Sequence, residues 1–94
     1  MVNHVAPHSS TAAVPQQAPE ENVEKFEDSI QDEARRRYAG IVDKLDESVG
    51  AIVKALETKG LLDNSILVFV SDNGGPAAGY DRNQASNWPL RGVS

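Results

Sequence analysis

The sequence contains no cysteine, which excludes a disulfide, a thiolate metal ligand and a cysteine nucleophile within these 94 residues. No stretch approaches the roughly 20 consecutive apolar residues of a membrane-spanning helix, and the first residues lack the pattern of a signal peptide. The net charge is -5, with acidic and basic residues interspersed, so the chain offers no basic surface to a nucleic acid. We therefore expect neither a membrane span nor a nucleic-acid partner.

Apolar residues make up 39% of the chain but are concentrated in its middle. That region has room for one helix and one apolar strand. Such a pair cannot complete a core, because a strand that is apolar on both faces needs helices on two sides and neighbouring strands for its backbone groups. We therefore expect the chain to be a fragment of a larger α/β domain.

Residues 1–27 show neither a helical nor a strand period and hold every proline except Pro76 and Pro89. This composition is typical of a loop region, and long loops in enzymes are often functional.

Residues 28–60 predict one long amphipathic helix. Apolar residues recur there at spacings of three and four, the opposite face is charged, and Gly60 follows a lysine as a C-terminal capping glycine should. Gly40 and Gly50 each cost about 1 kcal/mol relative to alanine inside a helix. We expect these glycines to allow close packing of the helix on a sheet.

Residues 66–70 form an unbroken apolar run, Ile-Leu-Val-Phe-Val, which predicts a strand buried on both faces of a parallel sheet. Asp72 and Asn73 follow at the carboxyl end, where α/β folds place their ligands, and both side chains carry oxygen donors suited to calcium. The glycines at 74 and 75 allow a tight bend. Residues 71–94 are therefore interpreted as a metal-site loop and tail, with an ordinary Asn-Gly turn as the alternative.

Three motifs occur in order: Tyr-Ala-Gly at 38–40, Ser-Asp-Asn-Gly-Gly at 71–75 and Asn-Trp-Pro-Leu-Arg-Gly at 87–92. Together they resemble the sulfatases of the alkaline phosphatase superfamily, most of all the arylsulfatase B or N-acetylgalactosamine-4-sulfatase type. The resemblance covers residues 38–92, and more weakly residues 3–8 and 30–37.

This resemblance implies an α/β domain that binds one Ca²⁺ and uses a formylglycine, made from a cysteine, as nucleophile. Asp72 and Asn73 match two calcium ligands of the family. His8 matches a catalytic histidine that could bind a sulfate oxygen and protonate the leaving alcohol. A solvated loop histidine is the alternative interpretation of His8.

The sequence lacks two features of the family. It has no Cys-x-Pro-Ser-Arg motif, and Val93-Ser94 stands where a sulfate-binding lysine is expected. The chain is therefore interpreted as a part, inactive alone, of a lysosomal or secreted enzyme that hydrolyses aryl sulfates or sulfated glycosaminoglycan sugars. The alternatives are a phosphate or phosphonate ester hydrolase of the same superfamily and a non-catalytic truncated relative.

Two further interpretations concern side chains outside that site. Three successive arginines, Arg35 to Arg37, point in different directions on a helix and are expected to form a solvated face. Trp88 is expected to pack against the domain and hold its loop in place.

Overall fold

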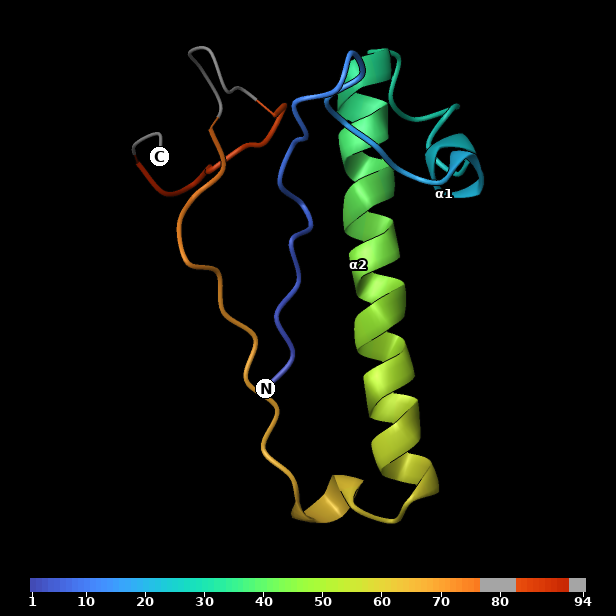
Figure 1. The fold of residues 1–94 in the computed structure, drawn as a ribbon, viewed down its shortest axis with the longest axis vertical. Helices are drawn as coiled ribbons and strands as arrows, with labels where there is room; N and C mark the ends of the chain where they lie inside the picture. Colours follow the sequence, from blue (N-terminus) through green and yellow to red (C-terminus); the bar gives the residue numbers. More distant parts are fainter. Residues whose placement is uncertain (77–82, 92–94) are drawn as a thin grey trace.

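The computed structural model describes residues 1–76 and 83–91. It contains α1 (Glu20–Glu24), the long helix α2 (Glu33–Thr58) and a short 3-10 helix, η1 (Leu62–Asn64). Figure 1 shows α2 along the long axis of the molecule, with α1 beside its N-terminal end. None of the helices in the described part of the chain is long and apolar enough to cross a membrane.

Helix α2 lies inside the predicted 28–60 region but begins later, at Glu33. The Asp32 side chain caps its start by accepting a hydrogen bond of 2.7 Å from the Arg35 backbone N–H. At the other end Gly60 has a φ of 64°, the left-handed conformation that glycine adopts after a helix. Local capping chemistry therefore sets both ends of this element.

The interior of the described residues is small. Val23 of α1 and Ile41 of α2 are its buried apolar side chains, and Gly40 is buried between the two helices. The rest of the apolar stripe on α2 is less well covered: Val42 is exposed, and the half-buried members are Leu45, Val49, Ile52, Val53 and Leu56. Because so little apolar surface is covered, polar contacts carry much of the docking of α1.

The predicted α/β fragment with a buried sheet strand is wrong. The described residues contain no strand, and residues 66–70 form an exposed, extended segment. Ile66 is 92% exposed and Phe69 is 74% exposed. A strand needs a neighbour for its backbone hydrogen bonds, and none of the segments described here supplies one. The apolar run alone does not create that partner.

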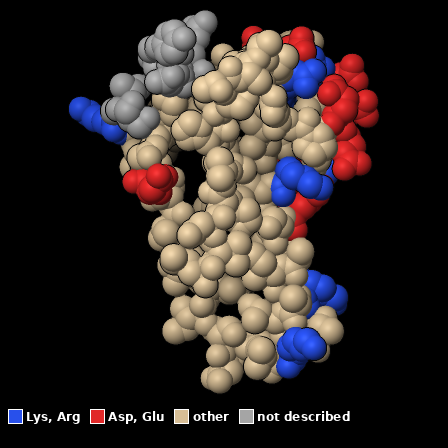
Figure 2. Space-filling view, viewed as in Figure 1, with Lys and Arg blue, Asp and Glu red and all other residues tan. Residues whose placement is uncertain are grey.

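Two surface predictions also fail. Trp88 is 85% exposed and so has little packing against the described part of the chain. The arginines are half-buried, and they pair with different partners: Arg37 lies 3.3 Å from Glu20 and 3.1 Å from Glu33, whereas Arg36 lies 4.0 Å from Glu27. Figure 2 shows charged side chains gathered along the α1 and α2 side, while much of the remaining visible face is uncharged.

Gly40 packs against α1 rather than a sheet. A Cβ at this position would lie 3.0 Å from Val23 Cγ2 and 3.1 Å from Val23 N, whereas a Cβ at Gly50 would meet nothing within 4 Å. We expect Gly50→Ala to stabilise α2 by about 1 kcal/mol. Gly40→Ala should lose that gain, because α1 must move away. Thermal unfolding followed by circular dichroism compares the two variants, and equal stabilisation of both would contradict the close contact.

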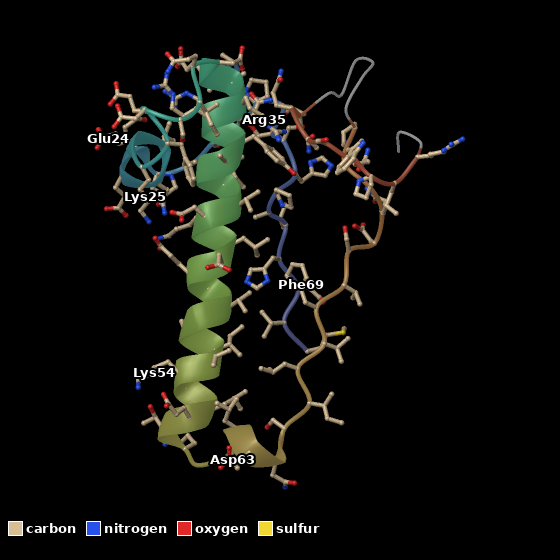
Figure 3. All side chains as sticks on the ribbon, turned by 180° about the vertical axis from the view of Figure 1, so that it is seen from behind. Glu24, Lys25, Arg35, Lys54, Asp63 and Phe69 are labelled. Atoms are coloured by element: carbon tan, nitrogen blue, oxygen red, sulfur yellow. The ribbon has the colours of Figure 1, made fainter. Side chains whose placement is uncertain are left out.

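A cluster of four side chains, here called the helix clamp, joins α1 to α2: Asn22, Lys25, Asp43 and Glu47. Asn22 is fully buried, and its amide nitrogen donates to Asp43 at 2.5 Å and to Glu47 at 2.8 Å. The Lys25 ammonium lies 2.6 Å from the Asp43 carboxylate and 3.1 Å from that of Glu47. Figure 3 shows Lys25, the residue that follows α1, beside α2.

The helix clamp makes α1 docking sensitive to acid. Hydrogen bonds from Lys44, Lys25 and Asn22 lower the pKa of Glu47 from 4.5 to about 2. The lowered pKa means that Glu47 contributes its stability above pH 4.5 and loses it as the pH falls toward 2. The pKa of Asp43 is also lowered, first by Lys25 and then by Asn22.

The largest cause of the lowered Glu47 pKa, the Lys44 hydrogen bond, lies within α2, and only the hydrogen bonds from Lys25 and Asn22 act between α1 and α2. We therefore expect α1 docking to weaken progressively as the pH falls from 4.5 toward 2. Glu47→Gln should weaken docking at pH 7 and flatten part of this acid transition, leaving the part due to Asp43. Amide hydrogen exchange of α1 measures the effect. Glu57→Gln is the control, because it removes the same charge from the last turn of α2, away from α1. An acid transition that is identical in wild type and Glu47→Gln would refute the role of Glu47.

Candidate functional site

A pocket of about 380 Å³ lies between the N-terminal segment, the turn after residue 71 and the segment 83–87. The described residues that line it are His8, Ser9, Ser10, Thr11, Asn73, Pro76 and Asn83. Two of the three predicted site residues, His8 and Asn73, therefore face the same space. Asp72 is adjacent to Asn73 in the chain but does not line the pocket.

His8 lies on the exposed rim of this pocket. Its Nδ1 lies 2.6 Å from the Ser9 carbonyl oxygen, and its backbone N–H donates to Val5 O at 3.0 Å. Because a carbonyl only accepts hydrogen bonds, Nδ1 carries a hydrogen in this contact. The other nitrogen, Nε2, has no partner among the described residues and could bind a ligand.

Asp72 and Asn73 form a turn held by local hydrogen bonds. Asp72 Oδ1 accepts from the Asn73 backbone N–H at 3.0 Å, and Asn73 Nδ2 donates to Gly74 O at 2.6 Å. Ser71 Oγ donates to Asn73 O at 2.6 Å. These bonds leave the second Asp72 oxygen and the Asn73 amide oxygen for other partners.

The donor set suits calcium in kind but is incomplete in number. Carboxylate and amide oxygens are the ligands that Ca²⁺ prefers, and the ion usually takes about six to eight oxygens. Within residues 1–76 and 83–91, no three or more histidine or acidic side chains gather in a group that could hold a metal. Asp72 and Asn73 could therefore supply two ligands of a site whose other ligands must come from elsewhere.

Segment 83–87 supports the turn on its other side. Asn87 Oδ1 accepts from the Gly75 N–H at 2.9 Å, and Asn87 Nδ2 donates to Gly75 O at 2.8 Å. Asn83 is 5% exposed, and its Oδ1 accepts from the Ala85 N–H at 3.0 Å.

Sequence reasoning gave no site role to Asn83, to the hydroxyl side chains next to His8, or to Asn87, although Asn87 begins the third motif. Asparagine and glycine enrichment near the end of the chain was the available signal, but it does not specify which pairs meet.

Comparison with known proteins identifies the family. The Sulfatase family model matches residues 1–93. Mouse arylsulfatase J is 46% identical over 79 residues, which is 83% of this chain and 12% of that protein. Rat N-acetylgalactosamine-6-sulfatase is 36% identical over 56 residues, 60% of this chain and 11% of that protein.

An ulvan-active sulfatase of Formosa agariphila is 46% identical over 35 residues, covering 37% of this chain and 6% of that protein. No solved structure matches the chain. The chain thus spans only 12% of the length of arylsulfatase J, the first of these relatives. The family-model match extends over nearly all of the sequence and confirms the resemblance drawn from the three motifs: the chain belongs to the sulfatase family.

Proposed function

We propose that this chain supplies part of the active site of a calcium-dependent sulfatase that hydrolyses sulfate esters of sugars or aryl alcohols. The observation that carries this proposal is the shared pocket: His8 and Asn73 are 65 positions apart in sequence yet line the same cavity. The hydroxyl, amide and imidazole side chains that line it offer hydrogen bonds to a hydrophilic ligand. The lysosomal or secreted location implied by the resemblance belongs to the same proposal.

Each residue has a distinct role in this proposal. Asp72 and Asn73 would hold Ca²⁺ through their side-chain oxygens, and the bound cation would neutralise charge on the sulfate group. As a nucleophile from outside these residues forms its bond to sulfur and the bond from sulfur to the alcohol oxygen breaks, Nε2 of protonated His8 would donate its proton to that oxygen, so that the alcohol leaves neutral. The chain has no cysteine to become formylglycine, so we expect no turnover by these residues alone.

A calcium titration of the 94-residue chain, followed by backbone amide NMR, tests the metal role. With only two ligands, we expect weak binding, with a dissociation constant of about 1 mM or above. The amide signals of Asp72 and Asn73 should shift most.

Asp72→Asn should abolish most of the shift, because it removes the charged ligand and keeps the side-chain shape. Asp63→Asn is the matched control, since Asp63 is an exposed aspartate in η1. Equal calcium-induced shifts in wild type and Asp72→Asn would overturn the metal role.

A further inference from the structure

We infer that Asn87 is a positioning residue, whose side-chain amide takes the place of a neighbouring strand and holds the Asp72–Asn73 turn at the pocket. The consequence for metal binding rests on the proposed function. The bracing of the turn is a separate claim that does not require a metal.

The first observation is the paired hydrogen bond between one side chain and one backbone residue. The Asn87 amide accepts from Gly75 N–H at 2.9 Å and donates to Gly75 C=O at 2.8 Å, and both bonds are partly buried. In a hydrogen-bonded pair of an antiparallel sheet, two directly opposite residues exchange the same two hydrogen bonds. Asparagine reproduces this pair with its own amide, which satisfies backbone groups that the missing strand partner would otherwise have paired.

The second observation is the close approach of the two segments. A Cβ added at Gly74 would lie 2.8 Å from Asn87 Oδ1, and a Cβ added at Gly75 would overlap the Cβ of Ala85. The two glycines therefore leave the space that segment 83–87 occupies. This contact explains the Gly-Gly pair by packing as well as by the bend itself.

The third observation is that segment 83–87 is anchored at its other end. The Asn83 N–H donates to Pro76 O at 3.0 Å, and Arg35 Nη1 on α2 donates to the Gln84 carbonyl oxygen. Figure 3 shows Arg35 at the end of α2 near this segment. Segment 83–87 can hold the turn only if the segment is itself fixed. The hydrogen bond from Arg35 fixes it to α2.

Two substitutions at Asn87 separate the parts of this contact. Asn87→Ala removes both hydrogen bonds to Gly75. Asn87→Asp keeps the acceptor for the Gly75 N–H but, as a carboxylate, has no donor for the Gly75 carbonyl. Asn64→Ala is the matched control, because Asn64 is exposed in η1.

The first readout is hydrogen exchange of the Gly75 amide. We expect exchange about tenfold faster in Asn87→Ala and a smaller increase in Asn87→Asp. The second readout is the calcium-induced shift of the Asp72 amide at a fixed calcium concentration. We expect it to fall about tenfold in Asn87→Ala, as is typical when a residue that orients a metal ligand is removed.

Unchanged Gly75 exchange in Asn87→Ala would overturn the brace. Faster exchange with an unchanged calcium shift would show that Asn87 holds the turn without positioning the ligands, and would overturn the positioning role. If calcium moves no signal even in wild type while Asn87→Ala still accelerates Gly75 exchange, the brace stands and the proposed calcium site fails.

Discussion

Asn22→Asp is expected to detach α1 from α2 at neutral pH. Asn22 is fully buried and donates to both Asp43 and Glu47, so aspartate would put a third carboxylate against two others and remove both donors. Burying a charge without a partner costs about 3 kcal/mol or more. The two buried apolar side chains, Val23 and Ile41, are too few to offset this loss.

Amide hydrogen exchange and limited proteolysis of α1 measure the detachment. Asn64→Asp is the control, because it adds the same charge at an exposed site and should change stability by less than about 0.5 kcal/mol. We expect α2 itself to remain helical in Asn22→Asp. If the α1 amides stay as protected as in wild type, the helix clamp does not hold α1 in place.

Gly75→Ala is expected to separate the turn at residues 72–75 from segment 83–87. The new Cβ would overlap the Cβ of Ala85, and because both atoms lie next to the backbone, no flexible side chain can move aside. Overpacking of this kind costs about 1–3 kcal/mol. The pocket wall should open because Asn73 and Asn83 line it from these two segments.

Chemical shifts of residues 83–87 and of His8 report the opening. Gly50→Ala is the control, because it makes the same change where a Cβ meets nothing within 4 Å. A second variant, Gly75→Ala with Ala85→Gly, should restore much of the wild-type spectrum by returning the missing space. Wild-type shifts in Gly75→Ala alone would show that the segments are not in contact.

The periodicity of apolar residues predicted the long helix well, because the signals for a helix lie within the helix itself. Apolar residues at spacings of three and four and a glycine after the last lysine are readable within one element, and α2 occupies Glu33–Thr58. The later start depends on the Asp32 cap and on the turn before it, where the Ile30 N–H donates to Phe26 O at 2.9 Å.

Whether residues 66–70 form a strand could not be decided from those residues alone. Its apolar sequence is compatible with a buried strand, but burial depends on partners far away in the chain or outside it. The described residues provide none, so the same side chains are exposed. The prediction that Trp88 packs against the domain was wrong for the same reason. An aromatic side chain packs only where another surface is available to contact it.

The candidate site was partly predictable for a different reason. The motifs around Asp72 and Asn73 and the weaker resemblance around His8 named three residues, and the structure places His8 and Asn73 in one pocket. Neither motif showed that Asn87 would pair with Gly75 or that Asn83 would line the pocket. Those contacts follow from how loops cross in space, which spacing along the chain does not encode.

The central claim is that Asp72, Asn73 and His8 belong to one sulfatase active site. Its most direct test is sulfate ester hydrolysis by a full-length sulfatase that contains these residues, compared with its Asp72→Asn, His8→Gln and Asp63→Asn variants. We predict that kcat/KM falls by about 100-fold or more for the first two, as expected for loss of charge stabilisation or proton donation, and stays at the wild-type value for Asp63→Asn. Wild-type kcat/KM in Asp72→Asn and His8→Gln would contradict the claim.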